Sequence, residues 1–206
     1  MHFAADDGKI DTMPSIFIGD NPGLEAVYED RGSRHCVIIT HPHSLMGGNM
    51  HNNVVMAAWD AALDNGYSAL RFNFRGVGKS GGSFDDGNAE VQDIAQAVAF
   101  VNKPVIIIGY SFGAWVASRY VKHSALPCIF VSPPTAMFDF PSMRDYEAWA
   151  VIGESDQYCS LLILKGLLDK DRITVVKHVD HFWSGAEDRL ESYLSEKLEL
   201  LTSVTP

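Results

Sequence analysis

The sequence has no run of lysine or arginine, and its 26 acidic residues outnumber its 16 basic ones to give a formal net charge of −10. Nucleic acids and anionic membranes attract proteins through clustered positive charge. We therefore expect neither nucleic acid nor a membrane as the main partner. Small molecules or other proteins remain as partners, and the oligomeric state stays open.

Cysteine is scarce, and its three residues, Cys36, Cys128 and Cys159, are too few and of the wrong parity for a disulfide framework. We expect free thiols in a reducing compartment. The first 13 residues are acidic and lack the apolar core of a secretion signal, and no stretch reaches the roughly 18 apolar residues that span a bilayer. These absences predict a cytoplasmic protein.

Short β-type runs alternate with longer stretches of helical period, which predicts an α/β fold with a mostly parallel sheet covered on both faces. The amphipathic stretches 91–101 and 190–201 are expected to supply covering helices, and 15–19 with 24–28 an antiparallel hairpin at the sheet edge. We expect residues 1–14 to form a flexible N-terminal extension and residues 15–206 a single domain. The expected parallel strands are 36–40, 69–74, 105–108, 128–131, 148–152 and 173–176.

The strongest chemical motif is the turn Gly109-Tyr110-Ser111-Phe112-Gly113, which matches G-x-S-x-G. Such a turn exposes its serine hydroxyl only where a strand ends and a helix begins. An apolar run precedes the turn and a stretch of helical composition follows it, so the context is the required one. We interpret Ser111 as a nucleophile.

A serine hydroxyl needs an imidazole to take its proton and a carboxylate to orient that imidazole. The chain order in this kind of fold is serine, acid, histidine. His181 follows the last expected strand in a loop, whereas His178 lies at the end of that strand, so we expect His181 to be the base. Asp156 is the preferred acid, with Glu154 and Asp139 as competitors.

Two backbone donors are also required for the oxyanion that forms during acyl transfer, and the residue after the nucleophile, Phe112, supplies one. The second is expected from the loop 41–48, where the sequence leaves His43 and Leu45 as alternatives. Tyr110 is a further candidate for contact with the substrate. A wider apolar wall for an acyl group is expected from Tyr110, Met137, Phe138, Phe140, Phe182 and Trp183, for each of which core packing is an equal alternative.

Two other patterns compete for a functional role. His41, His43 and His51 lie close in sequence, but no carboxylate or cysteine joins them, so we expect no metal site. The segment 76–81 matches the dinucleotide pattern G-x-G-x-x-G, but further loop residues separate it from the next helix. We therefore expect no bound cofactor.

Four segments, 41–50, 71–80, 109–114 and 180–183, together resemble the α/β-hydrolase superfamily. Within it they are similar to small lidless bacterial hydrolases related to dienelactone hydrolases and serine peptidase-like esterases. The resemblance implies a three-layer α/β-hydrolase fold, a triad of Ser111, Asp156 and His181, and an oxyanion hole beside the loop 41–48. Related sequences usually carry proline at the position of Ser44.

A cap domain in this superfamily commonly follows the strand that here ends at Val131, and the segment 132–147 is too short to hold one. The site is therefore expected to be open. Three hypotheses follow: a serine hydrolase that acts on an ester, thioester or peptide-like bond through an acyl-enzyme, a non-catalytic binding protein, and a cofactor-free perhydrolase with the same triad. The sequence does not identify the substrate.

Overall fold

The computed structural model describes residues 13–203, which are built around one eight-stranded sheet in the order β1-β2-β4-β3-β5-β6-β7-β8. β1 and β2 are antiparallel at one edge, and the strands from β4 to β8 are parallel. The strands are β1 (Ile16–Ile18), β2 (Leu24–Glu29), β3 (Cys36–Thr40), β4 (Ser68–Phe72), β5 (Val105–Tyr110), β6 (Cys128–Val131), β7 (Ala148–Gly153) and β8 (Ile173–Val176).

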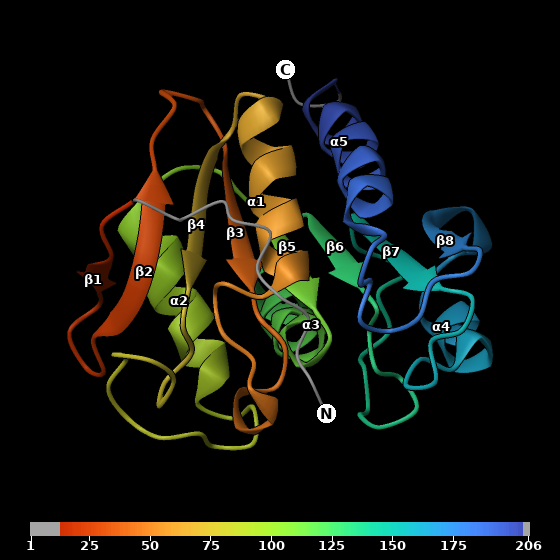
Figure 1. The fold of residues 1–206 in the computed structure, drawn as a ribbon, viewed down its shortest axis with the longest axis horizontal. Helices are drawn as coiled ribbons and strands as arrows, with labels where there is room; N and C mark the ends of the chain where they lie inside the picture. The colour runs from red at the N-terminus through yellow and green to blue at the C-terminus, as the bar shows by residue number, and fades with distance from the viewer. Residues whose placement is uncertain (1–12, 204–206) are drawn as a thin grey trace.

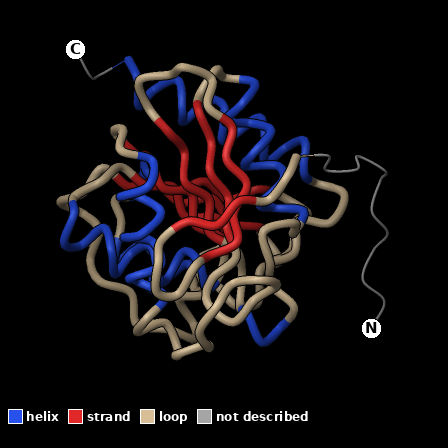
Figure 2. Tube along the Cα trace, turned by 90° about the vertical axis from the view of Figure 1, so that its left-hand side faces the viewer, coloured by secondary structure: helices blue, strands red, loops and turns tan. Residues whose placement is uncertain are grey.

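Helices cover both faces of this sheet (Figures 1 and 2). One face carries α1 (Asn53–Asp64) and α5 (Glu187–Ser203), and the other carries α2 (Glu90–Val101) and α3 (Phe112–Ser124). The short helix α4 (Leu161–Leu167) and two single turns, η1 (Ser44–Met46) and η2 (Lys170–Arg172), lie in connections. The result is the expected three-layer sandwich.

The central strands are apolar throughout because successive side chains enter two separate cores. In β5, Val105 and Ile107 pack with α2 and α3, whereas Ile106 and Ile108 pack with α1 and α5. The cysteines take part in this packing, since Cys36 and Cys128 are buried free thiols. Cys159 is a half-buried free thiol, so none of the three is bridged.

The six expected parallel strands all occur, with ends that differ by at most two residues, and the edge hairpin is confirmed as β1 and β2. The sequence analysis did not predict α1 or α4. The apolar side of α1 is built largely from alanine, which gives a weak periodic signal, and α4 is only seven residues long. Asn52 is the N-cap residue of α1, and its side chain accepts from the backbone N–H of Val54. Asparagine is a preferred N-cap residue, so it was the sequence signal that could have indicated the start of this helix.

The chain leaves β3 toward one edge of the sheet and leaves β5 toward the other, so the strand order reverses between these neighbours. Ligands of open α/β sheets bind beyond the carboxyl ends of the strands at such a point. The segment 132–147 between β6 and β7 contains no helix or strand, so no cap domain follows β6. The carboxyl edge at β3 and β5 is therefore the place where a site is expected.

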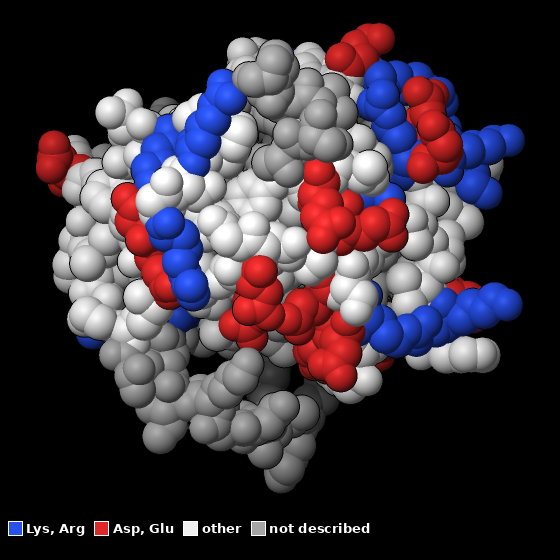
Figure 3. Space-filling model, turned by 90° about the horizontal axis from the view of Figure 1, so that it is seen from above, with Lys and Arg blue, Asp and Glu red and all other residues white. Residues whose placement is uncertain are grey.

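The expected N-terminal extension lies almost entirely outside the described residues, although Met13 packs against the core formed with α1 and α5. The end of the molecule opposite the carboxyl edge of the sheet bears acidic and basic side chains next to one another (Figure 3). Within residues 13–203, no helix has the length and apolar character needed to cross a membrane.

Candidate active site

Ser111 lies in the sharp turn between β5 and α3, with φ 53° and ψ −121°. This left-handed backbone is costly for a residue with a Cβ and persists only where the surroundings enforce it. The backbone N–H of Ser111 donates to the carbonyl of Val131 at 3.0 Å, which fixes the turn against the end of β6. The turn between a strand and a helix that the sequence predicted is therefore present, and its backbone is strained at Ser111.

The two glycines of the motif allow close approach between the turn and its neighbours. A Cβ at Gly109 would lie 2.7 Å from the Cα of Ala114, and one at Gly113 would lie 2.6 Å from the carbonyl oxygen of His41. Both distances are shorter than real Cβ contacts. Glycine at these positions lets α3 start directly above the strand ends and beside the loop after β3.

His181 lies between the serine and a carboxylate. Its Nε2 is 2.9 Å from the Oγ of Ser111, and its Nδ1 is 2.9 Å from each carboxylate oxygen of Asp156. With the proton on Nδ1, the ring donates to Asp156 and accepts from the serine hydroxyl. All three residues are buried. The structure thus brings together Ser111, His181 and Asp156, the three residues that the sequence analysis expected to form a triad.

Asp156 is held as a carboxylate. Burial raises its pKa, but the hydrogen bond and charge of His181 and the backbone N–H of Tyr158 outweigh burial, so the pKa lies below its usual value. Its Oδ1 accepts from the backbone N–H groups of Tyr158 at 2.9 Å and Cys159 at 3.2 Å. These bonds fix the orientation of the carboxyl group toward His181.

Neither Glu154 nor Asp139, the competing candidates for the acid, is bonded to His181 within the described residues. The carboxylate of Glu154 accepts from the backbone N–H of His178 at 3.2 Å. The backbone carbonyl of Asp139 accepts from the indole of Trp115, and Asp139 makes no bond with His181 within the described part of the chain. The Oδ1 of Asp180 accepts from the N–H of Phe182, as expected of a turn residue.

The loop after β3 lies beside the nucleophile turn. The carbonyl of His43 accepts from the N–H groups of Met46 and Gly48, and the His43 ring packs 4.9 Å from that of Phe112. The N–H of Leu45 donates to Nδ1 of His43 at 3.3 Å, and the Leu45 side chain is 70% exposed. Phe112 is the first residue of α3, where a backbone N–H has no partner within the helix.

The position of Tyr110 differs from its expected role in substrate contact. Its side chain is 3% exposed, and its hydroxyl donates to the backbone carbonyl of His181 at 3.0 Å. Trp183, expected in the apolar wall, is also fully buried. Both side chains therefore pack inside the protein, beneath the loop that carries His181, and do not face the solvent. Met137 and Phe182, from the same expected wall, are exposed.

The histidines after β3 bind protein groups. Nδ1 of His41 lies 2.6 Å from the carbonyl of Pro42, and its Nε2 accepts from the N–H of Phe74 at 3.0 Å. Nδ1 of His51 lies 3.2 Å from the guanidinium of Arg71. Among residues 13–203, no group of three His, Cys, Asp or Glu side chains is arranged to hold a metal ion.

The buried His41 predicts a pH dependence of stability. Burial lowers the pKa of His41 to about 4, so between pH 6.5 and 4 the unfolded chain binds a proton that the folded chain does not. The free energy of unfolding should fall by about 3 kcal/mol across that window as the pH decreases. Urea titrations at several pH values should show this slope reduced in His41→Gln. The exposed His123→Gln should retain it, and equal slopes in the two variants would contradict the assignment.

The segment 76–81 does not open a helix, since α2 begins only at Glu90. Polar contacts with other parts of the protein hold this loop in place. The guanidinium of Arg75 pairs with the buried Asp93 at 2.7 Å, and the N–H of Lys79 donates to the carboxylate of Glu25. The loop is thereby fixed against α2 and β2.

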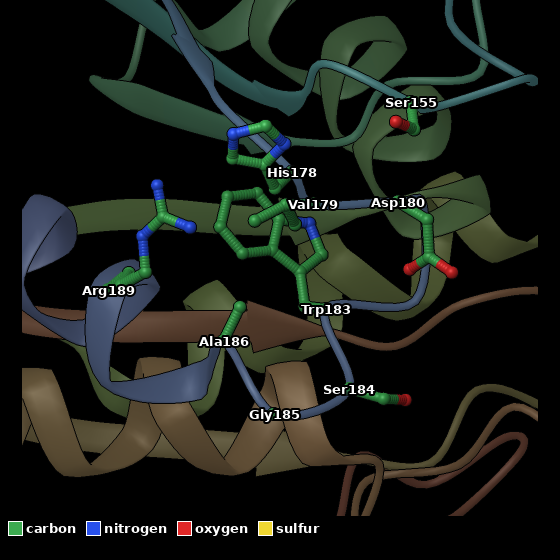
Figure 4. A pocket seen from close by; sticks show the side chains of 9 residues that line it. All are labelled: Ser155, His178, Val179, Asp180, Trp183, Ser184, Gly185, Ala186 and Arg189. Atoms are coloured by element: carbon green, nitrogen blue, oxygen red, sulfur yellow. The ribbon is translucent and has the colours of Figure 1, made fainter.

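A polar hollow of about 290 Å³ lies next to the histidine loop (Figure 4). Figure 4 shows Arg189 and Asp180 on opposite sides of the Trp183 indole. Residues on both sides of His181 line the hollow, but neither His181 nor Ser111 does. It is therefore separate from the serine and histidine pair.

Comparisons with known proteins identify the family of the chain. The family model described as "Alpha/beta hydrolase family" matches residues 37–197. Uncharacterized protein RP471 of Rickettsia prowazekii is 31% identical over 216 residues, which cover 93% of this chain and 91% of that protein.

Solved structures show the same fold. An alpha-beta serine hydrolase homologue from Coxiella burnetii is 26% identical, with a TM-score of 0.79 over 93% of this chain and 100% of that one. XC6422 from Xanthomonas campestris, described as an α/β serine hydrolase without lid, is 26% identical, with a TM-score of 0.81 over 96% of this chain and 99% of that one. The chain belongs to the alpha/beta hydrolase family.

Proposed function

We propose that the protein is a serine hydrolase that cleaves a carboxylic ester, thioester or peptide-like bond, with Ser111 as nucleophile, His181 as base and Asp156 as orienting carboxylate. The observation that carries the proposal is the continuous path from the Ser111 hydroxyl through His181 to Asp156, with 2.9 Å at each contact. The similarity to a solved structure described as a serine hydrolase without lid supports it.

In the first half-reaction, His181 Nε2 accepts the hydroxyl proton while Ser111 Oγ bonds to the substrate carbonyl carbon. The imidazolium that forms is stabilised by the Asp156 carboxylate. It then gives its proton to the leaving alcohol, thiol or amine as the bond to the carbonyl carbon breaks. The product of this step is an acyl-enzyme on Ser111.

In the second half-reaction, His181 takes a proton from water, and the hydroxide oxygen bonds to the acyl carbon. The bond from that carbon to Ser111 Oγ breaks, and His181 returns the proton to Oγ. A carboxylic acid leaves, and the enzyme regains its starting state. The proton transfers between Ser111 and His181 take place across the 2.9 Å contact between Oγ and Nε2.

For the tetrahedral oxyanion we propose the backbone N–H groups of Phe112 and His43 as donors. The N–H of Phe112 lies at the amino end of α3, where the helix dipole also favours negative charge. His43 is preferred over Leu45 because the N–H of Leu45 already donates to the His43 ring. Pro42, between β3 and His43, has no N–H to offer.

The substrate we propose is a small molecule with an apolar acyl group. Four large apolar side chains are exposed on the loops that carry or border the site: Leu45, Met46, Met137 and Phe182. The Phe182 ring lies edge-on to the His181 ring, with centroids 5.6 Å apart. Exposed apolar side chains beside a catalytic site are available to contact the apolar part of a substrate.

A non-catalytic binding protein would have no need of this arrangement. Ser111 is kept in a strained turn, and the cost of such a backbone is usually associated with function. The distance of 2.9 Å from its Oγ to His181 also argues for proton transfer. A catalytic role therefore accounts for both the strained turn and the short contact, whereas a binding role accounts for neither.

The test is reaction with a fluorophosphonate probe at neutral pH, followed by peptide mass spectrometry. We expect one adduct per chain, on the peptide that contains Ser111, because only an activated serine displaces fluoride from such probes. Denatured protein serves as the control and should not react. An unmodified native protein, or an adduct on the exposed Ser155 instead, would contradict the proposal.

A further inference from the structure

The loop that carries His181 is hydrogen-bonded to side chains of three other segments. Tyr110, the last residue of β5, donates from its hydroxyl to the carbonyl of His181 at 3.0 Å. Asn53, the first residue of α1, donates to the carbonyl of Phe182 at 3.0 Å. The indole N–H of Trp183 donates to the hydroxyl of Ser132, directly after β6, at 2.9 Å. Three consecutive residues are thus each attached to a different part of the fold.

Two of these three bonds are buried. Tyr110, Ser132 and Trp183 each have at most 3% of their surface exposed, whereas the bond from Asn53 lies at the surface. A hydrogen bond in such surroundings is stronger than in water, and leaving one partner unpaired is costly. The two buried bonds therefore restrict the loop most.

The bond between Trp183 and Ser132 joins two strained positions. Trp183 has φ 59° and Ser132 has φ 45°, and neither is glycine. Backbone strain of this kind persists only where neighbouring contacts enforce it, and it clusters at functional sites. Figure 4 shows the Trp183 indole at the centre of the loop from His178 to Ala186.

We propose that Tyr110, Ser132 and Trp183 are positioning residues whose two buried hydrogen bonds hold His181 within reach of both Ser111 and Asp156. The proposal rests on the proposed function of those three residues. Tyr110 directly precedes Ser111, so its bond ties the backbone of the base to the strand that presents the nucleophile. A misplacement of about 1 Å at a reacting group can lower the rate about 10²-fold. Bonds that hold His181 in place can therefore have a large effect on the rate.

The first test is Tyr110→Phe, which removes only the hydroxyl. We expect kcat for p-nitrophenyl acetate to fall about tenfold or more, with KM within about twofold, because the buried hydroxyl orients the base and does not touch substrate. The matched control is Tyr67→Phe, since the Tyr67 hydroxyl donates to the carbonyl of Leu198 at 2.7 Å and the residue is 4% exposed. The control should lower the melting temperature similarly and leave kcat unchanged.

A second test removes the hydrogen bond between Trp183 and Ser132 by substituting each partner in turn. Trp183→Phe should lower kcat by removing this bond alone. Ser132→Ala should lower kcat at least as far, because it removes the same bond and also the hydrogen bond between the Ser132 side chain and Asp156. The double variant should be little worse than Ser132→Ala alone. The low-field proton resonance of His181 Nδ1–H should broaden or vanish in Tyr110→Phe and persist in Tyr67→Phe.

The outcomes separate the two proposals. If the wild-type protein reacts with the fluorophosphonate probe while Tyr110→Phe, Trp183→Phe and Ser132→Ala all react at the wild-type rate, the positioning role is overturned and the hydrolase function stands. A wild-type protein that never reacts would contradict the hydrolase function itself. Should Trp183→Phe or Ser132→Ala fail to fold, the other variant still breaks their bond. Should Tyr110→Phe fail to fold, those two variants decide the matter.

Discussion

Ser111→Ala is expected to lower kcat for p-nitrophenyl ester hydrolysis about 10⁶-fold, the loss that follows when the nucleophile of such a triad is removed. Alanine keeps the Cβ, so the left-handed turn at φ 53° and the packing around it stay as they are. Only the oxygen that bonds to the substrate carbon is lost. Initial rates across esters of increasing chain length, with a mass-spectrometric check for wild-type contamination, would measure the effect.

Ser118→Ala is the matched control for that substitution. Ser118 lies on α3, the helix that follows the nucleophile turn, is also buried, and its hydroxyl donates to the backbone carbonyl of Trp115 at 2.7 Å. It has no contact with His181, so kcat should stay within about twofold of wild type. Retention of more than about 1% of kcat in Ser111→Ala would contradict the assignment of the nucleophile.

The strands and the positions of the site residues could be predicted because local signals specify them. Central parallel strands are apolar on both faces, which makes β5 and β6 visible as short apolar runs. The G-x-S-x-G turn needs its glycines for steric reasons that act within a few residues. The acid and base could then be placed by chain order and by their position after a strand.

The supports of the site could not be predicted in the same way. For Tyr110 and Trp183, which are aromatic and near the site in sequence, contact with an acyl group and core packing were equal alternatives. Their actual partners, the carbonyl of His181 and the hydroxyl of Ser132, are 71 and 51 residues away in the chain. Nothing local encodes such pairs. The need for glycine at position 153 could not be predicted either, because it comes from a distant residue. A Cβ at Gly153 would lie 2.3 Å from the carbonyl oxygen of Val179.

Asp156→Asn is expected to lower kcat about 10⁴-fold with little change in fold, through the tautomer of His181. Oδ1 of Asp156 accepts two backbone N–H bonds, so the amide oxygen of asparagine would take that place. The amide NH₂ would then face Nδ1 of His181 and donate to it. The ring proton would move to Nε2, which could no longer accept the proton of Ser111.

The control for this variant is Glu154→Gln, a carboxylate two residues away on the same loop that binds the backbone of His178. Its kcat should be unchanged, because no step of the proposed reaction uses Glu154. Proton NMR would add a structural readout, since the low-field His181 Nδ1–H signal should disappear in Asp156→Asn and persist in Glu154→Gln. If both variants lost activity equally, the loop as a whole would be responsible, and the orienting role of Asp156 would be wrong. If only Asp156→Asn loses activity, the effect follows from its carboxylate, whose lowered pKa keeps it ionised at neutral pH as the imidazolium of His181 requires.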